Sequence, residues 1–257
     1  MDPNDIKNIL PPSVVENLLG PASDAIGKAL GGALYWSFGW LIKRGIIKKA
    51  EFDDLARKTN EKYQQIPETN RSNEKSGLAL KALEESKYQL NEEILREMFS
   101  QLIANSVDNR RNNDISPRFA TVLSQLSGTD AKFFKFLVQD CSGDIPYGYL
   151  IEYTKKYVSY YPISDKYYLA SSTPLFAQVP QPTIDTLSSL GLINHSENKL
   201  PAGKEFDYKY STIEKNLRHQ VSLYTESHKS EKREPIEFKQ GNIEVSEFGK
   251  KFANAIL

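Results

Sequence analysis

The sequence contains one cysteine, Cys141, and only three histidines, His195, His219 and His228. A lone cysteine excludes an internal disulfide, which agrees with a reducing compartment. We interpret Cys141 as a small, buried apolar residue. The histidines lie far apart and lack the short spacings with which histidines ligate a metal ion. We therefore expect no metal site and interpret all three histidines as solvated surface residues.

The chain also lacks an excess of charge of either sign, because 33 basic residues balance 33 acidic ones. A protein that grips a phosphate backbone usually carries a net basic face or domain, so this balance argues against a nucleic-acid partner. A phosphate-binding loop is missing too. The nearest match, from Gly20 to Lys28, has two extra residues between its glycines, and Ala29 replaces the magnesium-binding hydroxyl. We expect no cofactor, no catalytic residue and no enzymatic activity.

No apolar run is long enough to cross a bilayer. The longest uncharged aromatic stretch, residues 29–42 (ALGGALYWSFGWLI), is shorter than the roughly 18 to 20 residues of a spanning helix. The first residues, with Asp2 and Asp5, do not resemble a secretory leader. We expect a cytoplasmic protein, with peripheral contact to the inner membrane as an alternative.

The same stretch has features of an interfacial membrane segment. Two glycines four residues apart let helices approach closely, large aromatic residues suit a bilayer interface, and flanking cations suit anionic lipid. The alternative is a core helix whose small residues permit tight packing. The candidate membrane or partner surface consists of Gly27, Gly31, Tyr35, Trp36, Trp40, Lys43 and Arg44.

Helical periodicity dominates the first half of the chain. Residues 48–63 place Phe52, Leu55, Ala56 and Tyr63 on one face. Further helices are predicted over residues 77–90, 91–109 and 117–127, with polar loops over residues 66–76 and 110–116. We predict a helical domain over residues 1–126.

The second half, residues 127–257, is predicted as a winged-helix-like domain with a small β-hairpin and a charged insertion at about residues 196–242. Its predicted helices span residues 127–140, 146–161 and 182–193, and a strand and helix close the chain. The second of these helices would align Tyr149, Tyr153, Tyr157 and Tyr161 on one face. Such a row could stack on bases, but we favour half-buried packing with hydroxyls at the rim.

A winged helix also suggests a transcriptional regulator, which is the alternative function. The helix that would enter the DNA groove, residues 182–192, holds Asp185 and no lysine or arginine. Base and phosphate contacts favour cationic and amide side chains at that position. We therefore expect this module to bind protein or to play a structural part.

The order of several motifs resembles the abortive-infection alpha family. Gly20-Pro21-Ala22 leads into a glycine-spaced helix, and residues 97–106 (EMFSQLIANS) are similar to the family's central helix. Residues 116–131, with Ser116-Pro117-Arg118-Phe119 and Asp130-Ala131, resemble its next motif. Residues 245–252 (VSEFGKKF) resemble its closing strand and helix. The resemblance covers roughly residues 15–255, and the order of the motifs, rather than any one of them, carries it.

The resemblance implies a role in bacterial defence against phage, in which an infected cell stops growing or dies before phage mature. It brings no catalytic residue set. The expected protein is therefore a non-enzymatic, mainly α-helical defence protein. It would act either as a membrane-perturbing effector or as a sensor or adaptor that binds a phage or host protein.

Overall fold

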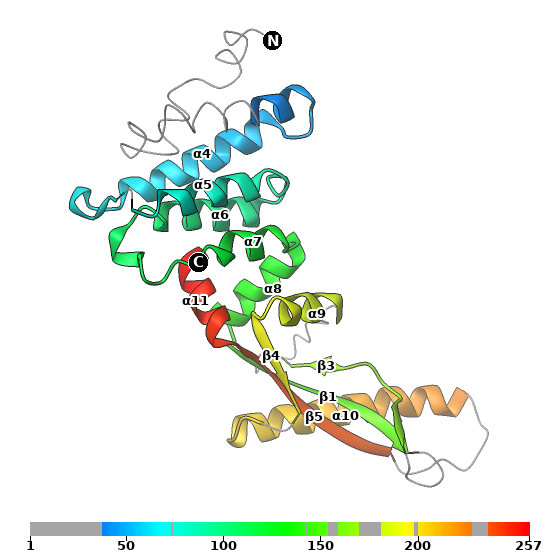
Figure 1. Ribbon diagram of the computed structural model, residues 1–257. Coiled ribbons are helices and arrows are strands. Elements are labelled where there is room, and N and C mark those ends of the chain that lie inside the picture. Colours follow the sequence, from blue (N-terminus) through cyan, green and yellow to red (C-terminus); the bar gives the residue numbers. More distant parts are fainter. Residues whose placement is uncertain are drawn as a thin grey trace. The chain divides into compact units, whose positions relative to one another are not determined.

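The computed structural model describes residues 38–72, 74–141, 143–153, 159–169, 181–197, 200–227 and 236–257 (Figure 1). The chain divides into two compact units. The first comprises Met1–Lys132 with Lys251–Leu257, and the second comprises Phe133–Lys250. Each unit is described by itself.

The first unit is built from helices, as the sequence predicts. These are α4 (Lys49–Gln64), α5 (Ser76–Ser86), α6 (Glu93–Asn105) and α7 (Arg118–Ser124), with short 3-10 turns at Glu68–Asn70 and Asn109–Arg111. Helix α4 buries its predicted apolar face, and α6 packs against both α4 and α5. The buried residues of α6 recur at three- and four-residue spacing because that spacing returns to one side of a helix; they include Leu95, Met98, Phe99, Leu102 and Ile103.

Two helices run from one unit into the other. Helix α8 (Gly128–Gln139) begins at a capping box in which Ser127 and Asp130 bond each other's backbone N–H groups. Helix α11 (Glu247–Ile256) follows the last strand, and the predicted closing strand and helix are confirmed.

The second unit holds an antiparallel sheet. Its strands are β1 (Asp144–Tyr153), β2 (Tyr160–Pro162), β3 (Tyr167–Tyr168), β4 (Ile193–Ser196) and β5 (Ile236–Val245). The order is β2-β1-β5-β4, with β3 also paired to β1. The two long strands pair from Asp144 opposite Glu244 to Glu152 opposite Ile236.

The helix predicted over residues 146–161 is wrong, because most of its described residues form β1. A four-residue spacing of tyrosines returns to the same face in a strand as well as in a helix, so the tyrosine row did not distinguish the two. Other residues favour the strand. Pro146 and Gly148 disfavour a helix interior, while tyrosine and isoleucine are common in sheets.

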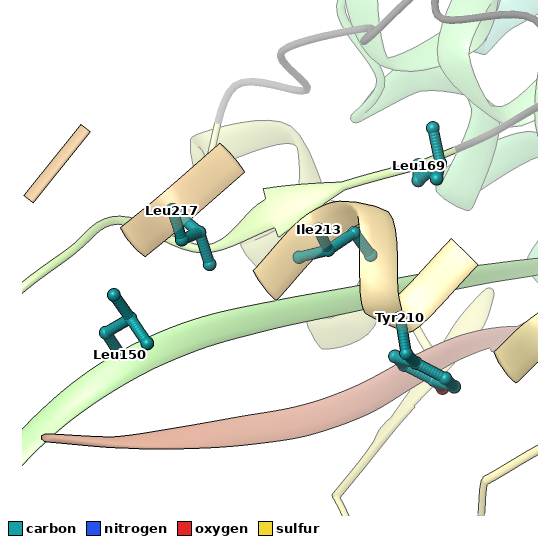
Figure 2. Close-up of a cluster of buried hydrophobic side chains, with 5 residues drawn as sticks. All are labelled: Leu150, Leu169, Tyr210, Ile213 and Leu217. Carbon is teal, nitrogen blue, oxygen red and sulfur yellow. The ribbon is translucent and has the colours of Figure 1, made fainter. Parts of the chain in front are cut away.

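Helix α10 (Lys204–Ser227) covers one face of this sheet (Figure 1). Its apolar residues Tyr210, Ile213 and Leu217 pack with Leu150 of β1 and with Leu169, as Figure 2 shows. The stretch predicted as a charged insertion, residues 196–242, therefore contains this helix and more than half of β5. It is part of the core of the second unit.

The winged-helix assignment is not confirmed. Helix α9 (Gln181–Ser189) and β4 lie where a third helix and a first wing strand were expected. Strands β4 and β5 pair antiparallel, but they form no tight hairpin because α10 separates them in sequence. Both strands instead belong to a larger sheet whose longest members are β1 and β5. The mainly helical class is confirmed, and a curled antiparallel sheet completes it.

Candidate functional site

The sheet face opposite α10 carries a compact group of titratable side chains. Alternation along β1 directs Leu150 toward α10, and Tyr147 and Tyr149 therefore point to the other face. There they meet three side chains from separate segments. Lys166 precedes β3, His195 lies on β4, and Glu197 follows β4. We call these five residues the tyrosine–lysine cluster.

Tyr147 forms the buried floor of the cluster. It has no exposed surface, and its ring stacks on that of His195 with centroids 4.5 Å apart and planes 6° from parallel. Across the strand pair, Tyr147 lies opposite Gly241 of β5. A Cβ atom at position 241 would lie 2.0 Å from the Tyr147 ring, so only glycine leaves room for this side chain.

Glu197 and Lys166 form the accessible rim of the cluster. The Glu197 carboxylate accepts a hydrogen bond from the Tyr149 hydroxyl at 3.1 Å and a longer one from Tyr147 at 3.5 Å. The Lys166 ammonium lies 3.3 Å from Nε2 of His195 and 3.9 Å from Glu197. It also lies 5.0 Å and 5.6 Å from the centroids of the Tyr147 and Tyr149 rings, within range of a cation–π attraction.

The environment fixes the charge state of most of these groups. Burial, reinforced by the Glu197 charge, raises the pKa of Tyr147 and raises the pKa of Tyr149 to about 12. Burial and the positive charge of Lys166 lower the pKa of His195. Burial also lowers the pKa of Lys166, although Glu197 and Asp185 oppose that shift. At neutral pH the phenols are therefore protonated. A neutral His195 can accept a hydrogen bond at Nε2 from the Lys166 ammonium.

This arrangement is suited to non-covalent recognition. The side chains of Lys166 and Glu197 are 27% and 42% exposed, so a cation and an anion are presented beside a fixed aromatic floor. A partner could pair with either charge without any change in the buried layer. Among the described residues, no group of three or more histidine, cysteine, aspartate or glutamate side chains is placed to hold a metal ion.

The structure revises the interpretation of one histidine and of the cysteine. His195 is half-buried and stacked in the cluster, so its assignment as a solvated residue is wrong. His219 is exposed on α10, as predicted, and His228 lies outside the described residues. Cys141 is a free thiol of intermediate burial, and burial raises its pKa to about 11, which disfavours the reactive thiolate.

The predicted aromatic stripe is only partly brought together. Tyr149 and Tyr153 share the β1 face, while Tyr157 lies outside the described residues. Tyr161 belongs to β2, where it pairs with Glu152 and donates a hydrogen bond to its carboxylate at 2.9 Å. Lys166 and Glu197 were missed. No local pattern marks either one, because strand pairing brings them to Tyr147 from distant positions.

Of the predicted membrane or partner surface, the structure describes only the last three residues, Trp40, Lys43 and Arg44. Gly27, Gly31, Tyr35 and Trp36 lie outside the described residues. Trp40 is 41% exposed, and the guanidinium of Arg44 lies 5.4 Å from its ring centroid. Lys43, Arg44 and Ile46 are also exposed. No helix in the described ranges is both long and apolar enough to cross a membrane.

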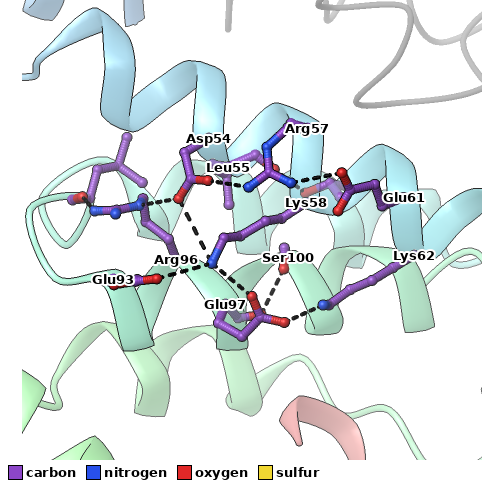
Figure 3. A network of polar contacts seen from close by, with 12 residues as sticks. Asp54, Leu55, Arg57, Lys58, Glu61, Lys62, Glu93, Arg96, Glu97 and Ser100 are labelled. Atoms are coloured by element: carbon purple, nitrogen blue, oxygen red, sulfur yellow. Dashed lines mark hydrogen bonds and ion pairs between the residues drawn. The ribbon is translucent and has the colours of Figure 1, made fainter.

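In the first unit, charged residues join α4 to α6 (Figure 3). Lys58 and Lys62 of α4 both bind the Glu97 carboxylate, with Lys58 at 2.9 Å. Asp54 of α4 accepts a hydrogen bond from Arg96 of α6 at 2.7 Å. Burial opposes ionisation of both carboxylates, but these partners outweigh it and lower the pKa of Asp54 and of Glu97. We call these five residues the α4–α6 ion network and assign it a structural role.

The other motif residues singled out in the sequence also have structural roles. The Asn105 side chain at the end of α6 donates a hydrogen bond to the Ala255 carbonyl at 2.9 Å. Ser246 caps α11 by accepting from the Gly249 N–H at 2.8 Å. Phe252 of α11 packs edge-on against Phe119 of α7. These contacts show that residues of the ordered motifs hold helices α6, α7 and α11 in place.

Comparison with known proteins identifies the family. No curated protein matches the chain, and no solved structure matches it. The family described as abortive infection alpha matches residues 47–256, which include residues of both units and every element from α4 to α11. The chain therefore belongs to the abortive infection alpha family.

Proposed function

We propose that this protein acts in abortive-infection defence against phage, without catalysing a reaction, by binding a phage or host protein. Membership of the abortive infection alpha family over residues 47–256 carries the proposal. The tyrosine–lysine cluster supports the binding mechanism. It offers an accessible cation and an accessible anion on a rigid, buried aromatic support, and preorganised charges of this kind favour specific recognition.

The first test is infection at high multiplicity of cells with and without the protein. The expected result is a lower phage yield together with arrested or dying cells. Lys166→Ala should weaken partner binding about fivefold and thereby raise phage yield, because an exposed charge pair contributes on the order of 1 kcal/mol to binding. Lys135→Ala is the matched control, since Lys135 is an exposed lysine on α8 of the same unit.

The outcomes separate the two parts of the proposal. Unchanged phage yield across a varied phage panel with the wild-type protein would refute abortive defence. Defence that persists fully in Lys166→Ala and in Glu197→Gln would refute recognition through the cluster. Circular dichroism of each variant distinguishes lost binding from lost folding.

A second mechanism, perturbation of the inner membrane by residues 22–42, is favoured by one observation. At the described end of this segment, Trp40 is 41% exposed and Arg44 lies over its ring. An aromatic residue beside a cation suits the interface of an anionic bilayer. Trp36, Gly27 and Gly31 would contribute to the same contact.

Flotation with anionic liposomes tests this mechanism. The wild-type protein should float, and Trp40→Glu or Trp36→Glu should reduce the floating fraction several-fold, because a carboxylate is repelled by anionic lipid. Tyr208→Glu is the control, since Tyr208 is exposed on α10 in the other unit. If the wild-type protein does not float even with extract from infected cells, the membrane mechanism is wrong.

A further inference from the structure

One side of strand β5 is only partly paired. Along its first side, β5 pairs with β1 from Ile236 to Glu244. On its second side, β4 pairs only with residues 242–245. Within the ranges that the structure describes, no strand pairs with residues 236–241 on this second side. These residues form an open strand edge, which is a template for another strand.

Two hydrogen bonds show which backbone groups point outward from this edge. The Val245 N–H donates to the Gly143 carbonyl on the β1 side, at 2.8 Å. The Ser246 N–H donates to the Leu192 carbonyl on the β4 side, at 3.0 Å. Because backbone direction alternates along a strand, even-numbered residues face outward. The open edge therefore presents the N–H and carbonyl groups of Ile236, Phe238 and Gln240.

The side chains of this edge are complementary to a second copy of themselves. Residues 236–240 read IEFKQ, with an acid and a base on either side of a central phenylalanine. When two copies pair antiparallel with Phe238 opposite Phe238, Glu237 of each copy lies opposite Lys239 of the other. Shifting by one step in either direction places Lys239 opposite Lys239, or Glu237 opposite Glu237. Opposite charges thus select one register, and like charges disfavour its neighbours.

A surface depression borders several residues of this edge. An open depression of about 710 Å³ lies beside the edge, lined by edge residues, by Tyr153 and by Glu214 and Arg218 of α10. Glu214 and Arg218 are 2.7 Å apart and neutralise each other. The depression therefore presents no uncompensated charge from α10 to an incoming copy.

We propose that two copies of this chain associate by antiparallel pairing of residues 236–240, which joins their sheets edge to edge. The central register forms about six N–H···O=C bonds. The Glu237–Lys239 pair that each chain makes internally at 2.6 Å is exchanged there for two such pairs across the contact. Many proteins block an open strand edge with charged side chains. Charges of one sign would repel a second copy in every register, whereas Glu237 and Lys239 have opposite signs. Because the contact is small, the dimer has a dissociation constant on the order of micromolar.

Sedimentation equilibrium of the purified full chain tests the proposal, from about 1 to 200 µM around that constant. The wild-type protein is expected to pass from monomer to dimer over this range. Lys239→Glu alone and Glu237→Lys alone should each weaken the dimer about tenfold or more, because each places two pairs of like charges across the contact. An equal mixture of the two variants should dimerise again, because acid then faces base at both positions.

A backbone variant provides an independent check. Gln240→Pro removes an outward N–H while leaving the β1 side intact, and proline is tolerated at such edge positions. It should abolish dimerisation, whereas the matched variant Gln240→Ala, which keeps the N–H, should not. Circular dichroism confirms that both variants fold.

Three outcomes would overturn the proposal. One is a wild-type protein that stays monomeric throughout the range. Another is a dimer that Lys239→Glu and Glu237→Lys both leave unchanged, because such a dimer would form through another surface. The third is a monomer whose phage defence is lost in Gln240→Pro but kept in Gln240→Ala, which would place a strand of a foreign protein at this edge. Association of the purified chain is measured without phage, so it succeeds or fails independently of the proposed function.

Discussion

Tyr147 occupies its position because the residue opposite it on β5 has no side chain. Its ring covers Gly241, stacks on His195 and places its hydroxyl near Glu197. The stack holds the imidazole where Lys166 contacts Nε2. One glycine thus determines the geometry of an aromatic floor to which four other residues are fitted.

Gly241→Ala should therefore destabilise the second unit by about 1–3 kcal/mol, the usual cost of overpacking a core. The Tyr147 ring would have to move, since the new Cβ would lie 2.0 Å from it. Urea denaturation followed by tyrosine fluorescence measures the change. Gly77→Ala is the control. Nothing lies within 4 Å of a Cβ at that helical position, so alanine there should be neutral or slightly stabilising. Equal stability of Gly241→Ala and the wild type would contradict this account of the floor.

At the scale of secondary-structure elements, the α4–α6 ion network joins two helices that also share an apolar contact. Glu97 forms ion pairs with both Lys58 and Lys62, and Asp54 forms one with Arg96. The pKa values of Asp54 and Glu97 are held below their ordinary values of 3.8 and 4.5. A carboxyl with a lowered folded-state pKa stabilises the fold above its unfolded pKa, and this contribution is lost as the pH falls through the folded value.

Acidification below about pH 4.5 should accordingly reduce the melting temperature of the first unit. Glu97→Gln should have a lower melting temperature than the wild type at pH 7, and a smaller further loss between pH 5 and pH 3 by differential scanning calorimetry. Glu84→Gln, at an exposed position on α5, serves as the control and should follow the wild type. If Glu97→Gln showed the same acid dependence as the wild type, the network would not contribute to stability.

The elements also show how far sequence patterns lead. The helices of the first unit were predicted because three- and four-residue apolar spacing, as in residues 48–63, has no competing interpretation. Strand β1 was not predicted, because tyrosines four residues apart lie on one face of a helix and also on one face of a strand. Helix α10 was missed although Tyr210, Ile213 and Leu217 recur at helical spacing, since its charged residues suggested an insertion. The partners of Tyr147 depend on strand pairing between distant segments, which no local pattern records.

For the whole molecule, the order of the chain differs from the order of its compact units. The second unit, Phe133–Lys250, is inserted between two parts of the first, and Lys251–Leu257 returns to complete the first unit. In that unit Phe252 packs on Phe119, and Asn105 binds the Ala255 carbonyl. The family match, residues 47–256, spans the insertion and includes residues from both flanking parts of the first unit.

The return of α11 to the first unit has a consequence during synthesis on the ribosome. Residues 251–257 emerge only after the whole of Phe133–Lys250 has been translated. Until then Phe119 lacks its aromatic neighbour and Asn105 lacks its carbonyl acceptor. A nascent chain therefore cannot complete its first unit early, and a product cut short within the second unit leaves both units unfinished. This arrangement delays a finished fold until residues 251–257 have been translated.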